Sequence, residues 1–406
     1  VVSDLNGDGR ADLHIKNPNY PSFTVTNLLM PYGMANTKIS FENPTLKPIE
    51  LNLSGVTYKP GSLQGSFEVQ ANGQPRYDLP LPLPKGTNGV EPNLSLVYSG
   101  GSGGGSFGGF QLAAGSKITL CPKDKINDGA IRGVRFDGQD PICLDGVRLI
   151  KISGNHLQSG AVYRSSSDTF TRVLAQGSGT GLWFEVRRKS GEILSMGKDE
   201  STCSDTDGAR LVPPGSSYPF AWAQSRLADR ANNYIAHCYS TDNNSGSQVL
   251  SDIYYTGNTA AGVSPYNRIS FSYINKVYPR IQYLGGKRFE SRYLLKAITS
   301  TVNGSAFSTI QLAYDANSIG NQHLLSELLY CGTNTTCFKP LEFSWDHAGS
   351  GFSTAALDTG HNTEGYENAG VHGDFNADGR FDYLLHHGDD KTYLYTSSAN
   401  GIGKTD

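Results

Sequence analysis

Residues 181–197 of this chain read GLWFEVRRKSGEILSMG. Apolar side chains occupy every second position at Leu182, Phe184 and Val186, and a period of two is typical of a β-strand with one buried face. A second strand-like run, Ile193–Met196, follows after a short polar stretch. This part of the chain therefore predicts two short strands.

The same alternation fills most of the chain. Between residues 112 and 345, short apolar runs are separated by turns about every ten residues, and we find no amphipathic helix longer than about two turns. Further runs lie at residues 133–136, 147–150, 169–173, 234–239, 269–273, 309–314 and 341–345. The sequence predicts an all-β fold, and its 406 residues predict several packed units or one large repetitive β architecture.

Composition narrows the classes of partner. Lys and Arg total 34 and Asp and Glu total 37, which leaves a formal net charge of −3 without long runs of one sign. This balance predicts neither a nucleic acid nor an anionic membrane as partner. The sequence contains no run of about eighteen apolar residues, so it predicts no transmembrane helix. The chain opens on Val1 and Val2 without an initiator Met, so we expect a fragment or a processed piece of a longer protein.

Six cysteines lie as close neighbours along the chain. Pairing them in sequence order predicts the disulfides Cys121–Cys143, Cys203–Cys238 and Cys331–Cys337. An even count at short separations favours disulfides and an exported protein. The alternative is six buried thiols in a cytosolic protein. The sequence contains no CxxC pair and no Cys/His cluster, so it predicts no zinc site.

An acidic stretch near the C-terminus, residues 374–382, reads DFNADGRFD. Oxygen-bearing side chains recur at every second position until Gly379, which permits a sharp turn. Calcium needs about six to eight oxygen ligands, so several must converge from a short segment. We expect Arg380 to offer only its backbone carbonyl. The expected side-chain ligands are Asp374, Asn376, Asp378 and Asp382.

Residues 4–12 repeat the pattern as DLNGDGRAD. Arg10 takes the carbonyl position, and an EF-hand is excluded because its twelfth-position Glu is replaced by Ile15 and Leu385 in the two copies. An ion-free acidic turn is the alternative, but two complete copies favour calcium. The side-chain ligands expected here are Asp4, Asn6, Asp8 and Asp12.

The glycine-rich residues 100–109, GGSGGGSFGG, match two catalytic patterns by letter. Gly103, Gly105 and Gly108 fit GxGxxG, and residues 100–104 fit GxSxG. Both patterns require a helix to follow, either to bind pyrophosphate or to complete a nucleophile elbow. Strand-like residues follow instead, so we expect a flexible turn.

No active site is evident from the sequence. Asp205–Gly208 and the pair Asp140 and Asp145 are interpreted as acidic turns in solvated loops, and a Ser/His/Asp triad need not be visible in sequence. No HExxH motif occurs among the nine scattered histidines, which are His14, His156, His237, His323, His347, His361, His372, His386 and His387. Core anchors at strand positions are expected at Trp183, Trp222 and Trp345.

Residues 65–345 resemble the N-terminal domain of the SpvB family, found at the head of Rhs/YD-repeat proteins and of the B components of insecticidal toxin complexes. Two positions depart from the family pattern, since Phe110 replaces a usual Trp and Asn232 a usual Gly. The motifs that carry the resemblance are residues 65–67, 79–83, 89–98, 136–138, 143–146, 181–186, 222–230 and 340–345, with Gly191 and Gly197.

The flanking residues 1–45 and 346–406 resemble FG-GAP/VCBS-type calcium repeats of integrin-like β-propellers, and residues 46–64 are interpreted as a connection. The resemblance implies an SpvB/Rhs-type β-sheet shell segment with β-propeller elements. In toxin-complex B components such a propeller docks the translocation channel, and the shell encloses a toxic C-terminal region. The ADP-ribosyltransferase activity known for SpvB lies in a separate domain, and no Glu-x-Glu pair here would carry it.

These observations predict a non-catalytic structural and binding segment of a large secreted protein, with Ca²⁺ as the cofactor of the propeller loops. The expected protein partner is a toxin translocation channel or the remainder of the same Rhs-like chain. A second hypothesis is a cell-surface adhesion module whose propeller binds a glycan or protein ligand on a host surface. A third hypothesis is an unrecognised hydrolase.

Overall fold

Strands dominate the residues that the computed structural model describes, which confirms the all-β prediction. Helical elements in this part of the chain are α1 (Lys125–Asp128) and the 3-10 turns η1 (Gly179–Gly181) and η2 (Thr333–Thr335), and no helix there is long enough to cross a bilayer. The chain divides into two units, Val1–Ser344 and Trp345–Asp406. The described residues are 2–3, 12–17, 20–25, 46–100, 106–167, 169–317, 322–345, 370–373, 375–376, 382–386, 392–398 and 401–405.

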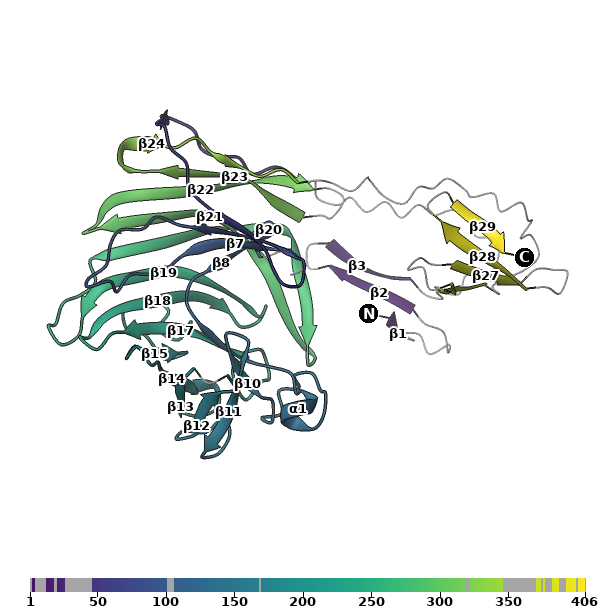
Figure 1. The fold of residues 1–406 in the computed structure, drawn as a ribbon, viewed down its shortest axis with the longest axis horizontal. Coiled ribbons are helices and arrows are strands. Elements are labelled where there is room, and N and C mark those ends of the chain that lie inside the picture. Colours follow the sequence, from purple (N-terminus) through teal and green to yellow (C-terminus); the bar gives the residue numbers. More distant parts are fainter. Residues whose placement is uncertain are drawn as a thin grey trace. The chain divides into compact units, whose positions relative to one another are not determined.

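Eight antiparallel strands of the first unit close into a barrel (Figure 1). The predicted strands within residues 181–197 supply two of them and are confirmed. In ring order the strands are β9 (Lys117–Leu120), β10 (Ile142–Leu144), β11 (Val147–Ser153), β12 (Val162–Ser165), β13 (Arg172–Gln176), β14 (Trp183–Arg187), β15 (Ile193–Met196) and β17 (Ala221–Ala228).

Alternate residues of the strands fill the barrel. Leu182 and Phe184 have no exposed surface, and neither has Trp222. The indole ring packs edge-on against Phe184 at 5.0 Å between centroids, and Nε1 donates a hydrogen bond to the Leu182 backbone oxygen at 2.7 Å. A buried indole N–H needs such an acceptor. Trp222 is thus the predicted core anchor, whereas the prediction for Trp183 is wrong, because it is half-buried beneath the Lys198 ammonium.

One strand, β17, belongs to two sheets. Its first residues pair with β9 and with the short strand β16 (Arg210–Leu211), while its last residues pair with β15 and β18 (Asn233–Asp242). The register shifts where Ser195 faces Arg226 and Met196 faces Gln224, so Ser225 forms a bulge. A bulge bends and twists its strand. This shape allows β17 both to close the barrel and to begin a larger sheet.

The larger sheet continues from β17 through six long antiparallel strands (Figure 1). Its faces differ, because Ile269 and Phe271 are buried whereas Arg268 and Ser272 are exposed. Alternation of this kind gives one apolar and one polar face. The strands are β18, β19 (Ser247–Asn258), β20 (Asn267–Leu284), β21 (Lys287–Val302), β22 (Ser305–Asn317) and β23 (Gln322–Cys331).

A small antiparallel sheet and its loops cover the apolar face of the larger sheet. The Tyr255 hydroxyl donates a hydrogen bond to the Pro84 backbone oxygen at 2.8 Å, and Asn267 Nδ2 donates one to the Lys85 oxygen at 3.1 Å. These bonds fix the segment between the second and third strands of the small sheet. Its strands are β5 (Ser66–Val69), β6 (Pro75–Pro80), β7 (Ser95–Ser99) and β8 (Phe110–Ala113).

Gly108, at the end of the glycine-rich stretch, is placed by a close backbone contact. Its oxygen accepts a hydrogen bond from the Leu325 amide at 3.0 Å, its φ is 59°, and a Cβ there would collide with that amide. Only glycine fits both demands. Strand β8 follows, so the expectation that no helix opens at Gly108 is confirmed, and the GxGxxG pattern that ends there lacks the helix it requires. The GxSxG match falls mainly on residues 101–105, which lie outside the described residues.

Residues 46–64 pack along the far edge of the larger sheet. Leu51 and Val56 contact a buried cluster that contains Leu329, and the Asn52 amide donates a hydrogen bond to Gln311 Oε1 at 3.0 Å. Strand β4 (Thr57–Tyr58) pairs in parallel with β24 (Thr336–Cys337), and β25 (Leu341–Glu342) pairs with β23. This cover protects an edge that would otherwise expose unpaired backbone groups.

All three predicted disulfides are confirmed: Cys121–Cys143, Cys203–Cys238 and Cys331–Cys337. The first joins β10 to the residue after β9, the second joins a loop to β18, and the third joins β23 to β24. Each restricts the unfolded chain, by roughly 3 kcal/mol for a loop of about 15 residues.

Two further sheets carry the strands near the ends of the chain. An antiparallel sheet contains β1 (Val2–Ser3), β2 (Asp12–Asn17) and β3 (Tyr20–Val25). The second unit contains an antiparallel sheet of β26 (Gly370–Gly373), β27 (Asp382–His386), β28 (Thr392–Ser398) and β29 (Gly401–Thr405). No propeller is formed by the described residues.

Candidate functional site

The C-terminal acidic loop is the first candidate site. Asp382 begins β27 and has no exposed surface. Its Oδ2 accepts a hydrogen bond from the Phe375 amide at 3.0 Å, and Asn376 is exposed. The carboxylate at the last ligand position therefore folds back over the start of the loop. The carboxylate expected at the ninth position of the calcium loop is thus buried and bonded to the loop backbone.

Most of the other expected calcium ligands lie outside the described residues. Asp12 begins β2, but its side chain lies outside the described residues. Within the described ranges, no group of three or more His, Cys, Asp or Glu side chains could hold a metal ion. Calcium therefore stays a prediction. The ligands outside the described residues are Asp4, Asn6, Asp8, Arg10, Asp374, Asp378 and Arg380.

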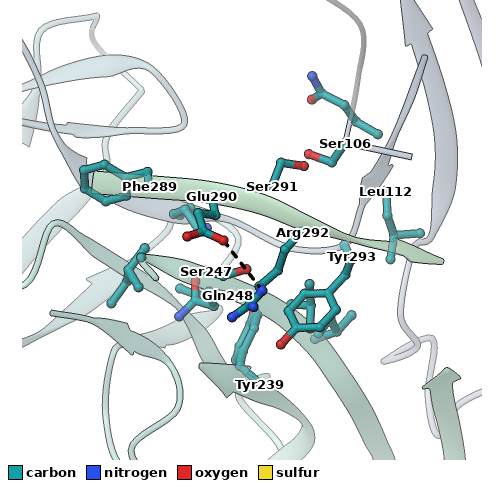
Figure 2. Close-up of a pocket in the computed structure, with 18 of the residues that line it drawn as sticks. Ser106, Leu112, Tyr239, Ser247, Gln248, Phe289, Glu290, Ser291, Arg292 and Tyr293 are labelled. Atoms are coloured by element: carbon teal, nitrogen blue, oxygen red, sulfur yellow. Dashed lines mark ion pairs between the residues drawn. The ribbon is translucent and has the colours of Figure 1, made fainter. Parts of the chain in front are cut away.

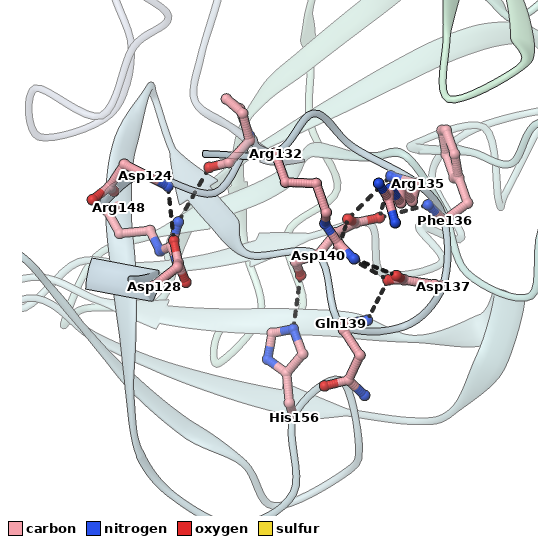
Figure 3. A network of polar contacts seen from close by, with 11 residues as sticks. Asp124, Asp128, Arg132, Arg135, Phe136, Asp137, Gln139, Asp140, Arg148 and His156 are labelled. Atoms are coloured by element: carbon pink, nitrogen blue, oxygen red, sulfur yellow. Dashed lines mark hydrogen bonds and ion pairs between the residues drawn. The ribbon is translucent and has the colours of Figure 1, made fainter. Parts of the chain in front are cut away.

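Asp140 was the second acidic candidate, and its predicted exposure is wrong. Only 1% of its surface is exposed. Its carboxylate accepts hydrogen bonds from the backbone amides of Arg135 at 3.0 Å and Phe136 at 2.6 Å, and Arg132 pairs with it at 2.9 Å (Figure 3). A buried carboxylate is stable only with such partners. Asp140 therefore organises the loop between β9 and β10.

His156 extends this network toward the barrel core (Figure 3). Its Nε2 lies 2.9 Å from the Asp140 backbone oxygen, and its Nδ1 lies 3.2 Å from the hydroxyl of buried Tyr163. Burial lowers the pKa of His156. On the same loop, Asp128 of α1 pairs with Arg148 at 2.6 Å. These contacts tie the loop between β9 and β10 to the barrel and so stabilise the fold.

A cavity of about 460 Å³ lies where the β8–β9 connection crosses the larger sheet (Figure 2). Its volume is in the usual range of small-molecule sites, about 300–1,000 Å³. Aromatic side chains form much of its wall, namely Phe107, Tyr239, Tyr273, Phe289 and Tyr293. Sequence reasoning missed this cavity because its residues come from four separate segments, within residues 106–117, 211–223, 239–250 and 273–293, and share no motif.

The charged groups of the cavity are unequally paired. Glu290 pairs with Arg292 at 3.7 Å (Figure 2) and with Arg288 at 2.7 Å, and Arg292 also pairs with Asp242 at 3.0 Å. Lys117 lines the same cavity and is exposed, yet surrounding protein lowers the pKa of its amine. No ion pair engages its ammonium among the described residues.

Sequence comparisons identify no relative: no family model and no curated protein matches this chain. Solved structures do match in fold. The crystal structure of TcdB2–TccC3 aligns with 92% of this chain at a TM-score of 0.60 and 14% identity, and 21% of that chain is covered. The Tc holotoxin pore of Photorhabdus luminescens aligns with 88% of this chain at 0.61 and 14% identity, covering 20% of that chain.

A third match is the N-terminal domain of the effector protein SpvB from Salmonella typhimurium strain LT2. It aligns with 62% of this chain at a TM-score of 0.50 and 18% identity, and 98% of that domain is covered. At these identities the matches show a shared fold. They support the SpvB and toxin-complex shell fold that the sequence motifs predict, and this chain spans about a fifth of the length of the toxin-complex chains.

His237 gives the fold a defined pH dependence. It is 4% exposed, and burial lowers its pKa to about 4. The unfolded chain, with a His pKa of about 6.5, binds more protons between pH 6.5 and pH 4. Stability contributed by neutral His237 is therefore complete above about pH 6.5 and is lost as pH falls, by about 2 kcal/mol at pH 5.

Denaturant unfolding of the wild type and His237→Gln, measured at neutral pH and at pH 5, checks this expectation. The wild type should lose about 2 kcal/mol more than the variant on acidification. The carboxylates titrate in both proteins, so the difference between the two losses of stability removes their contribution. Equal losses in both proteins would show that His237 does not titrate as described.

Proposed function

We propose that this chain is a structural segment of a larger toxin-complex-like protein, in which it forms part of the wall around an enclosed polypeptide. The observation that carries the proposal is the TcdB2–TccC3 match over 92% of this chain, with a fifth of that chain covered. The role needs no catalytic residue. The protein partner would be a translocation channel or the remainder of the same chain.

The construction of the first unit supports a wall. One face of the larger sheet is apolar and covered by a second sheet, and residues such as Arg268 and Ser272 leave the other face polar. One edge merges into the barrel and the other is covered by residues 46–64. A protected sheet resists edge-to-edge aggregation. Three disulfides favour an oxidising compartment and therefore a secreted protein.

Calcium at the two acidic loops is the second part of the proposal. The four-stranded antiparallel sheet β26–β29 has the strand number and pairing of a propeller blade. Asp382 lies buried at the start of its second strand, with its carboxylate turned toward the loop. Calcium bound by the folded loop alone would stabilise this sheet by mass action.

The wall role predicts protection inside the full-length polypeptide. Limited proteolysis of the native protein should spare an enclosed segment that is cut readily after denaturation, because the sheet excludes the protease. The fragments can be assigned by mass spectrometry. If every segment outside this chain is cut at the same rate before and after denaturation, the wall proposal is wrong.

Calcium should raise the unfolding temperature of the second unit. At about 100 times its Kd, the ion adds about 2.7 kcal/mol, and this gain should disappear in Asp378→Ala. Asp8→Ala tests the N-terminal loop in the same way. Calorimetry with calcium or a chelator measures the effect, and Asp315→Ala, an exposed aspartate on β22, serves as the matched control. Identical unfolding transitions with calcium and with chelator would show that calcium does not stabilise the protein.

A further inference from the structure

A lysine and a serine meet at the wall of the cavity. Lys276 Nζ lies 2.8 Å from Ser291 Oγ, and Ser291 lines the cavity (Figure 2). We propose that Ser291 and Lys276 form a nucleophile and base pair for acyl transfer, with small esters as the substrate class. This activity goes beyond the wall role and does not depend on it.

A β-bulge aims Lys276 at the serine. Strands β20 and β21 pair Asn275 with Tyr293 and Arg280 with Ser291. Residues 276–279 therefore stand opposite Arg292 alone. Insertions of this kind redirect side chains and are over-represented next to active sites. The regular ladder resumes at Arg280, so the bulge is confined to residues 276–279.

The surroundings of Lys276 suit a base. None of the described carboxylates forms an ion pair with it, Arg280 on the same strand repels its charge, and His323 on β23 is the other titratable neighbour. Burial, the larger cause, and Arg280 lower the pKa of Lys276 to about 8. About a tenth of the amine is then neutral near pH 7. A half-buried ammonium without a carboxylate partner is less stable than a solvated one, and groups with shifted pKa values cluster at functional sites.

The cavity provides room for a substrate beside Ser291. Its aromatic wall suits an apolar acyl or alcohol group, and its volume suits a small molecule. Lys117 adds a positive charge to the same space. That charge favours a substrate on which negative charge is present or develops during the reaction.

The reaction follows the serine–lysine variant of nucleophilic catalysis. Ser291 Oγ bonds to the ester carbonyl carbon while its proton passes to the neutral Lys276 amine. The tetrahedral intermediate then breaks the bond to the alcohol, which takes the proton from the Lys276 ammonium. Water repeats the sequence on the acyl-serine, so ester and water become acid and alcohol, and the enzyme is regenerated.

A fluorophosphonate probe tests the proposal on the intact chain. Ser291 Oγ should bond to phosphorus with loss of fluoride, and mass spectrometry should place the adduct on Ser291. The labelling rate should rise with pH through about 8, as the Lys276 amine loses its proton. Ser291→Ala should remove the adduct. Ser270→Ala should not, because Ser270 lies on the neighbouring strand β20 and its hydroxyl donates a hydrogen bond to Asp252 Oδ1 instead.

The Lys276→Arg variant tests whether Lys276 acts as a base or only as a structural contact of Ser291. Arginine keeps the positive charge and can still donate a hydrogen bond to Ser291, but it does not deprotonate near neutral pH. The variant should keep the wild-type unfolding temperature and label at least about a hundredfold more slowly, the usual contribution of a general base. Lys296→Met, at an exposed lysine of β21, is the control. Absence of an adduct on Ser291, or equal labelling of folded Lys276→Arg, overturns the proposal.

Discussion

The double pairing of β17 is the constraint on which the first unit depends. Its first half closes the barrel against β9, and its second half starts the larger sheet against β18. The Ser225 bulge allows this change of partners, and its hydroxyl donates a hydrogen bond to the Ser195 oxygen at 3.2 Å. Trp222 holds the same strand in the barrel core. Without β17 both sheets would have an open edge.

The proposed wall follows from this arrangement. A sheet of this length would expose a large apolar face, which the β5–β8 sheet covers, and Gly108 allows the covering backbone to approach Leu325. The far edge is covered by residues 46–64 and tied by the Cys331–Cys337 disulfide. The aromatic cavity lies where the β8–β9 connection crosses this sheet.

Much of this fold could be predicted from local sequence, because strand alternation, turn residues and cysteine order are local signals. The alternation at Leu182 and Phe184 predicted β14, and all three disulfides followed from sequence order. Long-range partners left no such signal. Asp140 resembled any acidic turn, yet its carboxylate is buried among backbone amides. The contact between Lys276 and Ser291 depends on a bulge, which shifts strand register without a marker in the sequence.

Hydrogen exchange of the wild type and Trp222→Ala measures most directly whether β17 couples the two sheets. Protection reports the free energy of local opening, segment by segment. If β17 is shared, loss of the indole should reduce protection in the barrel strand β14 and in the sheet strand β19 by similar amounts. A loss confined to the barrel, with β19 as protected as in the wild type, would contradict the account.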